Sequence, residues 1–342
     1  MRKMQLGATG VEISVLTMGT LSMGGDQVWG PSDDEESIRS INAAKDLGIT
    51  CFDTAAFYGF GRSETILGKA LKEDRNHFIV STKCGLDWDT GEGSFWFERN
   101  GHRVSRDLSA KAVRRSVENS LQRLQMDHVD ICYTHRQAVE PHKAPIEETM
   151  GEMMRLQKEG KIRFIGVSNV TLDQLKEYMK YGRVEAVQQR MSMLTLTDYN
   201  MVEEYCLENN IMFQAYSVLE RGLLTGAYTM ESVITPGDAR NEWCSWYQPE
   251  KRKLVLDMMD GWKDLCEKYD CSQAALSVAW LTQQNPNVNA DIGSRRVKNI
   301  QDNARGGEIL LEDADLARMN AAVAKLHEET AEYGDPDSEV FK

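Results

Sequence analysis

The sequence predicts a single α/β domain: a (β/α)8 TIM barrel with an N-terminal β-hairpin and long loops over the carboxyl ends of its strands. Three observations predict this fold class. Short apolar runs alternate with amphipathic segments, which is typical of a parallel sheet covered by helices. Eight such units follow one another, enough to close the sheet into a barrel. Residues 1–342 have a length common for one barrel, and no low-complexity linker divides them.

Turn and capping residues predict the first elements. Residues 4–6 and 11–14 flank Gly7-Ala8-Thr9-Gly10 and are expected to pair as a β-hairpin, followed by a strand over 15–19. Ser32 or Asp33 is expected to cap a helix that ends at Leu47, because acidic residues fill its first turn. The later units are strands 49–53, 78–83, 129–135, 162–167, 184–190, 211–216 and 288–292, and helices 63–72, 109–124, 146–159, 171–181, 200–209, 250–269, 272–284 and 297–305.

Two connections, roughly residues 85–108 and 220–249, are longer than ordinary loops, and such loops are usually functional or disordered. Both leave the carboxyl ends of predicted strands, so they would overhang that end of the barrel. Aromatic residues in them would either wall a substrate pocket or simply pin the loops to the barrel. These residues are Trp88, Phe95, Trp96, Phe97, Trp243, Trp246 and Tyr247.

Composition and charge exclude several classes of function. Hydrophobic residues make up 41% of the chain and charged residues 27%, as in ordinary globular proteins. A formal charge of -13 argues against nucleic acid or an anionic membrane surface as the main partner. No apolar run has the length of a transmembrane helix or forms a signal-peptide core. The seven cysteines form no Cys-x-x-Cys pair, and the six histidines show no ligand spacing, so we expect free thiols, a cytoplasmic location and no metal site.

Three predicted strands end in titratable side chains: Asp53, Lys83 and His135. A small-residue turn places Tyr58 five positions after Asp53. The carboxyl ends of parallel strands meet at one rim, where barrel active sites lie. Each residue alone is commonly structural, as a strand-end ion pair or a packed turn tyrosine. Three polar strand ends in succession, with the tyrosine beside them, indicate a proton-transfer site.

The chemistry of this set depends on the phenol. The reference pKa of tyrosine is about 10, and an ammonium such as that of Lys83 within hydrogen-bond reach lowers it. Asp53 would keep Lys83 charged, because buried charges persist when they are paired. His135 would orient a carbonyl oxygen or share the proton relay. The set suits a reaction in which an oxygen gains or loses a proton while hydride moves elsewhere.

The turn Asp53-Thr54-Ala55-Ala56-Phe57-Tyr58-Gly59, followed by Arg62-Ser63-Glu64 and Leu67-Gly68, resembles the Asp-Thr-Ala-x-x-Tyr-Gly signature of the aldo-keto reductase family. The resemblance runs over nearly the whole chain. It implies a catalytic tetrad in which Tyr58 is the general acid of carbonyl reduction, or the base of the reverse reaction. Lys83 and Asp53 would tune Tyr58, and His135 would position the carbonyl.

Later motifs resemble the family's nicotinamide cofactor site: Gly166-Val167-Ser168-Asn169, Gln188, Ala215-Tyr216-Ser217 and Gly293-Ser294-Arg295. The resemblance implies that Ser168, Asn169 and Gln188 hold the carboxamide. The other implied cofactor-binding residues are Thr20, Asp53, Met191, Tyr216, Ser217, Leu219, Gly222, Gly293, Ser294, Arg295, Asn299 and Asn303. No Gly-x-Gly-x-x-Gly turn occurs, which fits a family that holds its cofactor extended across a barrel.

The chain departs from the family pattern at four positions. Met191 occupies a position that is usually the nicotinamide-stacking tyrosine, although a thioether also packs against aromatic rings. Val218 replaces the proline of the usual Ser-Pro-Leu, and Glu220 adds a negative charge near the phosphate loop. Asn299 stands where glutamine is common. None of these changes removes the tetrad.

Charge favours NADP(H) over NAD(H). Ser294, Arg295 and Arg296 lie at a predicted helix start, where guanidinium groups and helix N–H groups suit a 2′-phosphate. The alternative is that these arginines are solvated, or contact only the adenine or pyrophosphate of NAD. Expected substrate-binding residues are Trp29, Tyr58, Trp88, His135 and Arg136, and Asp87, Arg99 and His102 are further polar candidates.

The resemblance therefore implies an NADP(H)-dependent reductase of aldehydes, ketones or carbohydrate-derived carbonyls. A neighbouring alternative is an NAD(P)-linked dehydrogenase of a sugar, glycoside or cyclitol. A nicotinamide-binding regulatory subunit with little turnover is a different class. A barrel isomerase or aldolase is a third, which requires Lys83 to be free of a carboxylate partner and able to form a Schiff base.

Overall fold

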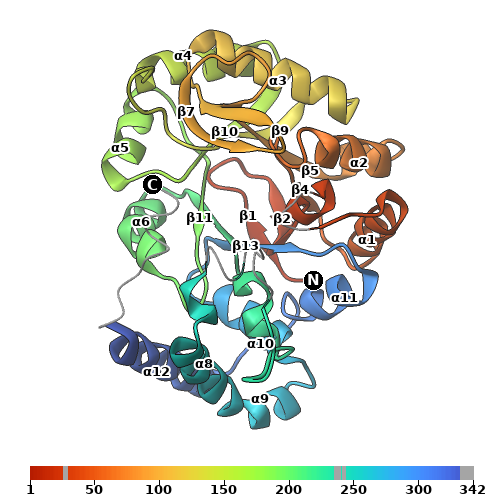
Figure 1. Cartoon of the computed structure of the whole chain (residues 1–342), viewed down its shortest axis with the longest axis vertical. Helices are drawn as coiled ribbons and strands as arrows, with labels where there is room; N and C mark the ends of the chain where they lie inside the picture. The colour runs from red at the N-terminus through yellow and green to blue at the C-terminus, as the bar shows by residue number, and fades with distance from the viewer. Residues whose placement is uncertain (26–29, 235–239, 241–243, 332–342) are drawn as a thin grey trace.

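Eight parallel strands close into a barrel in the computed structural model, which describes residues 1–25, 30–234, 240 and 244–331 (Figure 1). Neighbouring barrel strands are also consecutive along the chain, apart from the sheet inserted after β5. The predicted (β/α)8 barrel is therefore confirmed. Its strands are β3 (Leu16–Gly19), β4 (Cys51–Asp53), β5 (Ile79–Cys84), β9 (Val129–Thr134), β10 (Ile162–Ser168), β11 (Ala186–Arg190), β12 (Met212–Tyr216) and β13 (Val288–Gly293).

Helices surround the barrel, and side chains cap several of them (Figure 1). Asp33 accepts a hydrogen bond from the Glu36 N–H at 2.7 Å, and Thr171 and Gln174 form a capping box. The α-helices are α1 (Asp34–Asp46), α2 (Arg62–Leu71), α3 (Ala110–Leu124), α4 (Ile146–Lys158), α5 (Leu172–Tyr181), α6 (Thr197–Glu208), α8 (Pro249–Asp260), α9 (Lys263–Lys268), α10 (Gln273–Leu281), α11 (Val297–Arg305) and α12 (Asp313–Thr330). Short 3-10 helices are η1 (Leu21–Gly24), η2 (Arg75–His77), η3 (Glu220–Thr225) and η4 (Ser245–Tyr247).

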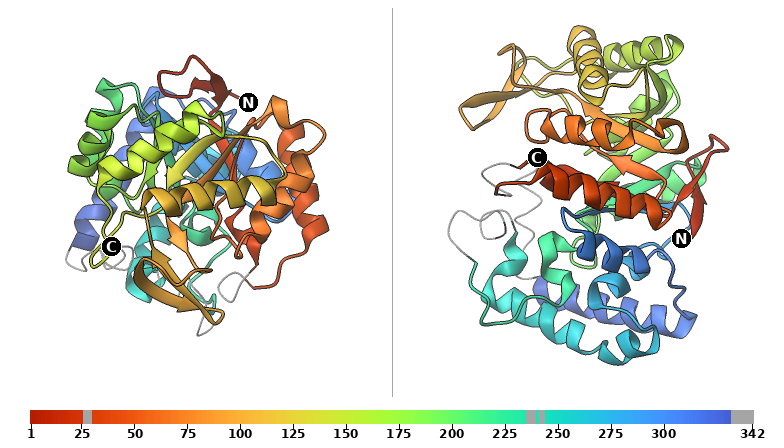
Figure 2. Two further views of the ribbon diagram at one scale, coloured as in Figure 1. Left: turned by 90° about the horizontal axis from the view of Figure 1, so that it is seen from above. Right: turned by 90° about the vertical axis from the view of Figure 1, so that its right-hand side faces the viewer.

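Two small antiparallel sheets lie at opposite ends of the barrel (Figure 2). The predicted N-terminal hairpin is present as β1 (Lys3–Gln5) and β2 (Glu12–Ser14). The connection after β5, expected as a loop, instead folds into β6 (Leu86–Asp87), β7 (Ser94–Arg99) and β8 (His102–Arg106). The signal for this sheet is Asn100-Gly101, where both residues have positive φ (51° and 74°), because Asn-Gly is a strong hairpin turn.

The C-terminal third contains two further corrections. The helix expected over 250–269 breaks at Gly261 and Trp262, so α8 and α9 are separate. The long helix α12 was not predicted; it follows the last helix expected from the sequence, 297–305. Met319, Val323 and Leu326 are its buried apolar residues, spaced four and three apart as on one helix face. Its last residue, Thr330, is also buried.

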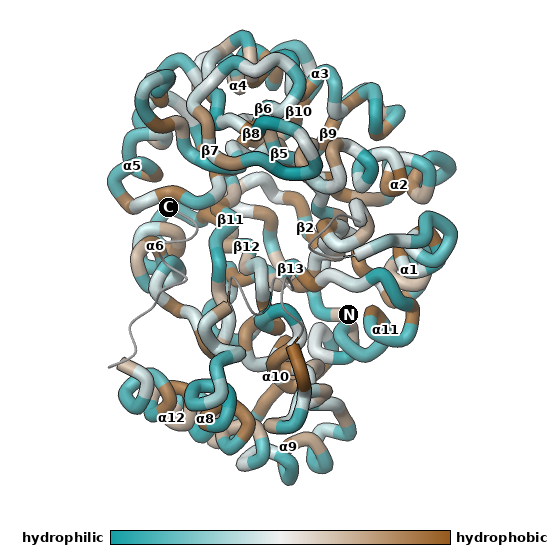
Figure 3. Tube along the Cα trace, in the orientation of Figure 1, coloured by the Kyte–Doolittle hydropathy of each residue, from teal (hydrophilic) through white to brown (hydrophobic). Residues whose placement is uncertain are grey.

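The core lies between the barrel and its helices. On α10 every residue from Ala274 to Leu281 is buried, and this helix is strongly hydrophobic in Figure 3. Strand register then fixes the rim: Gly19 pairs with Asp53, Asp53 with Ser81, and Lys83 with Tyr133. Asp53 and Lys83 therefore come to the same end of neighbouring strands. Among the described ranges, no helix is long and apolar enough to cross a membrane.

Candidate active site

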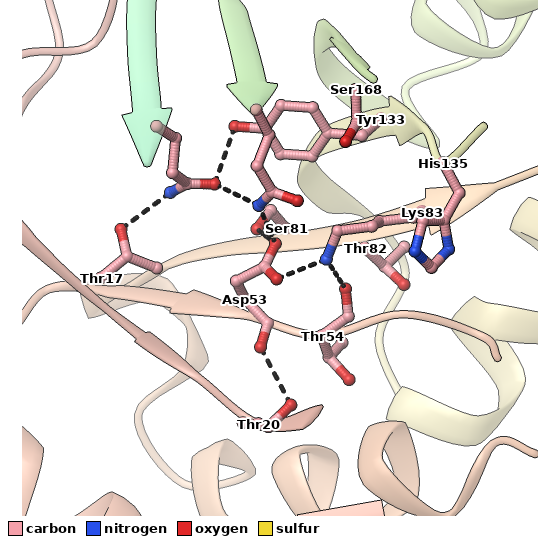
Figure 4. A network of polar contacts seen from close by, with 12 residues as sticks. Thr17, Thr20, Asp53, Thr54, Ser81, Thr82, Lys83, Tyr133, His135 and Ser168 are labelled. Atoms are coloured by element: carbon pink, nitrogen blue, oxygen red, sulfur yellow. Dashed lines mark hydrogen bonds and ion pairs between the residues drawn. The ribbon is translucent and has the colours of Figure 1, made fainter. Parts of the chain in front are cut away.

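A buried ion pair forms the floor of the candidate site (Figure 4). The Lys83 Nζ contacts Asp53 Oδ2 and donates to the Thr54 carbonyl at 2.8 Å. The other oxygen of Asp53 accepts from Ser81 Oγ at 2.6 Å and from Gln188 Nε2 at 3.1 Å. Each side chain of the pair is only 1% exposed. The partners of Lys83 hold it in its charged form, because burial without a partner would disfavour the ammonium.

Tyr58 reaches this pair from the turn after β4. Its ring centroid lies 4.7 Å from the Lys83 Nζ and 5.7 Å from the His135 ring, which it meets edge to face. The turn depends on Gly59, which has a φ of 59° and would bring a Cβ to 2.6 Å from the Gly24 Cα. Only glycine fits such an approach. Asp53, Tyr58, Lys83 and His135 thus gather at one place, as expected for strand ends that share a rim.

Burial outweighs the lysine in setting the protonation of the phenol. It raises the pKa of Tyr58 to about 12, although the charge and hydrogen bond of Lys83 lower it. Lys83 thus acts on the phenol in the expected direction, but burial has the larger effect. Burial alone would lower the pKa of Lys83, but Asp53, Tyr58 and Asp291 raise it above its ordinary value. At neutral pH the site holds a protonated phenol beside an ammonium.

His135 completes the group as a neutral imidazole. Burial, followed by the charges of Lys83 and Arg136, lowers the pKa of His135 well below 6.5. Its backbone is fixed by an N–H bond to the Cys84 carbonyl at 2.8 Å. A neutral ring carries one N–H donor, which suits it to orient an oxygen atom rather than to supply a charge.

Sequence analysis missed Asp291, a carboxylate at the same rim. It lies on β13 beside Thr17, and its Oδ1 is buried without a hydrogen-bond partner. A Cβ at Gly19 would lie 2.4 Å from this oxygen, so the glycine makes room for it. Burial and the charge of Asp53 raise the pKa of Asp291 well above 3.8. The available signal was a carboxylate between the apolar residues Ala290 and Ile292 of a strand.

The candidates for the carboxamide of nicotinamide lie next to His135. Asn169, with a φ of 56°, donates from Nδ2 to the His135 carbonyl at 2.9 Å and to Ser168 Oγ at 2.8 Å. Tyr216 donates its hydroxyl to Asn169 Oδ1 at 2.7 Å. Gln188 is turned to the barrel interior, where its Nε2 bonds to Asp53 and, at 2.6 Å, to Gln214 Oε1.

Met191 and Thr20 are fully buried cofactor candidates. Met191 is 0% exposed and belongs to the hydrophobic core, whereas Tyr216 is partly exposed at the rim. The structure therefore does not place Met191 among the accessible residues. Thr20 is also 0% exposed; its hydroxyl donates to the Asp53 carbonyl at 2.9 Å and accepts from Ser63 Oγ at 2.6 Å. Thr20 therefore fixes the backbone of the turn between Asp53 and Ser63 that carries Tyr58.

The loop from β12 into η3 is held by a second buried ion pair. Glu220 accepts from Arg190 Nη2 at 2.7 Å, and its other oxygen accepts from Ser192 at 2.7 Å and Thr195 at 3.0 Å. Burial alone would raise the pKa of Glu220, but Arg190 and Arg221 hold it below its ordinary value. The expectation that Glu220 adds a net negative charge near the phosphates is wrong, because the side chain points inward and is neutralised.

This buried pair supports an unusual backbone. Ser217, Glu220, Arg221 and Gly222 have φ values of 59°, 44°, 52° and 103°. Three of these four are not glycine, and such residues persist in the left-handed region only where the surroundings enforce it. Ser217, Leu219 and Gly222 are partly exposed along the loop. The loop therefore presents a fixed backbone beside the site.

The remaining cofactor candidates lie between β13 and α11. Arg295 donates to the Pro31 carbonyl at 2.8 Å, and Arg296 is the residue before the first turn of α11. Ser294 Oγ accepts from the Arg296 N–H at 3.0 Å. Gly293 and Asn299 are exposed, whereas Asn303 is buried. Both arginines directly precede the first turn of α11 in the chain.

The aromatic residues of the loop sheet mainly pin it to the catalytic turn. Trp88 packs edge to face on Phe57 and Phe60, at centroid distances of 6.3 and 5.7 Å. His102 lies 4.6 Å from the Phe60 ring. Arg99 lies over Phe57. Asp87 is paired with Arg115. These contacts favour a structural role over a place in a substrate pocket for Trp88, His102, Arg99 and Asp87.

The structure describes only some of the remaining candidates. Arg136, next to His135 in the chain, lies over the Trp96 ring at 5.4 Å. In η4, Trp246 and Tyr247 are buried. Trp29 and Trp243 lie outside the described residues. A metal site is not found among the ranges that are described. Because Lys83 is paired with Asp53, the Schiff-base alternative loses the free lysine that it requires.

Comparisons with known proteins agree on one family. The family model "Aldo/keto reductase family" matches residues 15–324. An Escherichia coli protein named NADH-specific methylglyoxal reductase is 38% identical over 328 residues, covering 95% of this chain and 99% of that protein. Aldo-keto reductase YhdN of Bacillus subtilis is 35% identical and covers 81% of this chain and 80% of its own length. The structure of glycerol dehydrogenase AKR11B4 from Gluconobacter oxydans superposes with a TM-score of 0.84 at 30% identity, covering 94% and 95% of the two chains.

Proposed function

Because the chain belongs to the aldo/keto reductase family, and so is an NAD(P)(H)-dependent oxidoreductase of carbonyl and alcohol groups, we propose that Tyr58 is its proton donor. The observation that carries this proposal is the Tyr58 phenol beside the Lys83–Asp53 pair, with the His135 ring edge to face against it. Burying the Lys83–Asp53 pair is costly, and a role in proton transfer accounts for its presence. Perturbed titratable groups that converge at a barrel rim are typical of catalysis.

The four side chains would divide the work of proton transfer. With a pKa of about 12, Tyr58 keeps its proton until an acceptor oxygen arrives. Lys83 then stabilises the developing phenolate, and Asp53 keeps Lys83 charged throughout. Neutral His135 donates to the same oxygen and fixes its position. Bound nicotinamide would supply the hydride.

The donor set fits a dinucleotide. The hydroxyl and amide of Ser168 and Asn169 suit a carboxamide, and the partly exposed Tyr216, in place of Met191, suits stacking on nicotinamide. The left-handed loop of Ser217, Leu219 and Gly222 would cover the pyrophosphate. At the far end we propose Gly293, Ser294, Arg295, Asn299 and Asn303 around the adenosine.

We prefer NADP(H) because of Arg295 and Arg296 at the start of α11. The name of the Escherichia coli relative specifies NADH, which makes a direct comparison of the two cofactors necessary. Replacing Arg295 by Ala should weaken NADPH binding about tenfold, as expected for the loss of roughly 1.4 kcal/mol, with little effect on NADH. Fluorescence titration with both cofactors measures this. Equal weakening of the two would refute the 2′-phosphate assignment. Arg39→Ala, an exposed arginine on α1, is the control.

The names of the relatives suggest the class of substrate. Methylglyoxal and glycerol are small polar molecules with adjacent oxygen functions. We infer that this protein acts on short oxo or hydroxy compounds of that kind, and a sugar, glycoside or cyclitol dehydrogenase is the second candidate. A regulatory subunit would saturate with NADPH but oxidise none of it against a carbonyl panel. Seven free cysteines keep the cytoplasm as the proposed compartment.

Substituting Tyr58 by Phe tests the central claim. Loss of the general acid should lower kcat by about 10²–10⁴-fold while cofactor affinity changes little. Steady-state kinetics and cofactor titration measure the two effects. Tyr181→Phe, at the exposed end of α5, is the matched control. Retained turnover in the Tyr58 variant would exclude it as the proton donor.

A further inference from the structure

Two cysteines meet where α9 ends. The helix closes with the two bonds of a Schellman motif: the Asp270 N–H donates to the Glu267 carbonyl at 3.2 Å, and the Cys271 N–H donates to the Cys266 carbonyl at 3.0 Å. Asp270 has the left-handed φ, 47°, that this motif requires. The residues bonded across the turn usually bring their side chains into contact. In this chain both of those residues are cysteines.

The contact between the two thiols is combined with access to solvent. The two thiols are close enough to affect each other's ionisation: the pKa of Cys266 is lowered and that of Cys271 is raised. Both residues are partly exposed, whereas the other five cysteines, all within the described residues, are buried. Cys84 and Cys132 also have neighbouring thiols, but they lie inside the barrel wall with 1% and 0% exposure. The two pairs thus differ mainly in access.

The backbone of the turn brings the two cysteines together, which a disulfide requires. A disulfide requires Cα atoms about 4.4–6.8 Å apart and side chains that point towards each other. The bond from the Cys271 N–H to the Cys266 carbonyl draws these two residues together across the turn. We propose that Cys266 and Cys271 form a reversible disulfide when the protein meets a peroxide-class oxidant. The cross-link would close the last turn of α9 on the outer wall of the barrel.

The chemistry balances with the oxidant alone. The neighbouring Cys271 thiol lowers the pKa of Cys266, which makes Cys266 the nucleophile. Its thiolate attacks one peroxide oxygen, the O–O bond breaks, and the departing oxygen leaves as water, giving a sulfenic acid on Cys266. The Cys271 sulfur then attacks the Cys266 sulfur, the S–O bond breaks, and a second water leaves. The two thiols lose two electrons, the peroxide gains them, and a dithiol reverses the change.

The disulfide would sit where three helices join. Ser272, directly after Cys271, caps α10 and also donates to Asp302 of α11 at 2.9 Å. Further along α10, Ser277 Oγ lies 3.4 Å from the Leu224 carbonyl in η3. None of these residues belongs to the tetrad. The site is therefore an addition to the proposed function and is tested without measuring turnover.

Peptide mapping of the full-length protein tests the proposal. The protein is treated with hydrogen peroxide, alkylated and digested with trypsin without reductant. Lys268 lies between the two cysteines, so trypsin separates them unless a disulfide joins the fragments. We expect a linked peptide that dithiothreitol splits, and no linked peptide in Cys271→Ser. Cys132→Ser, which removes a thiol of the buried pair, should leave the link intact.

Two outcomes would overturn the proposal. The first is that the Cys266 and Cys271 peptides stay separate in oxidised protein whose circular dichroism remains that of the folded state. The second is that Cys84 and Cys132 become linked at the same rate, because access would then not select the pair. If Cys271→Ser folds poorly, Cys266→Ala serves as the second variant and must also lose the link.

Discussion

Asp53–Lys83 in the barrel and Glu220–Arg190 under the loop into η3 are both buried carboxylate–cation pairs. Their partners are equally inaccessible: the side chains of the first pair are 1% exposed, and those of the second 0% and 4%. What differs is the neighbourhood. A phenol and an imidazole stand beside the first, whereas hydroxyl groups and left-handed backbone surround the second. The same interaction therefore supports the proposed proton transfer in one place and the backbone conformation in the other.

The largest expected effect comes from breaking the catalytic pair. Lys83→Met should lower kcat by about 10²–10⁴-fold, because the phenolate loses its stabilising charge. It should also destabilise the protein by roughly 3–5 kcal/mol, because Asp53 is left buried and unpaired. The double variant Asp53→Asn/Lys83→Met separates the two effects: stability should recover and turnover should not. Recovery of both would show that the pair is only structural.

Breaking the second pair should leave turnover almost intact. Glu220→Gln removes the charge that Arg190 compensates, so we expect a stability loss of the same order, about 3–5 kcal/mol. Cofactor affinity should fall about tenfold, since part of the binding energy must now order the loop. Denaturation and cofactor titration measure these, with Glu204→Gln, exposed on α6, as control. A fall in kcat as large as that of Lys83→Met would contradict the comparison.

Substituting Asp291 should have the smallest effect, and it tests the electrostatics around the Asp53–Lys83 pair. Its charge raises the pKa of Tyr58, so Asp291→Asn should lower that pKa. The alkaline limb of the kcat/KM profile, where Tyr58 loses its proton, should move to lower pH. An unmoved limb would mean that Asp291 does not act on the phenol.

The same substitution makes a prediction about stability. The folded protein binds the proton of Asp291 more tightly than the unfolded chain, which releases it near pH 3.8, so this residue lowers stability as the pH rises from 3.8 through its raised folded pKa. Asp291→Asn should therefore gain stability relative to the parent at neutral pH and little near pH 3.5. Denaturant unfolding at the two pH values measures the difference. A constant difference would argue against a raised pKa.

Local pattern was sufficient for most of the fold. Strand and helix positions agree to within a few residues, for example Cys51–Asp53 where 49–53 was expected, because alternating apolar runs and capping residues act over short distances. The prediction errors occur where contacts between residues distant in the chain decide the structure, or where a local signal was passed over. Helix α12 is held by packing rather than by caps, and the Asn100-Gly101 turn was overlooked within a segment judged only by its length.

The order of residues alone determined that a carboxylate, an ammonium and an imidazole end three successive strands and that a phenol follows the first, since parallel strands must bring such ends to one rim. Only the folded barrel decided which charges are neutralised and which surfaces stay open. Glu220 accepts a hydrogen bond from Arg190 of β11, and Asp291 packs against Gly19 where β13 pairs with β3. Met191 is fully buried, whereas Tyr216 is partly exposed. These outcomes depend on contacts between residues far apart in the chain, which no local periodicity encodes.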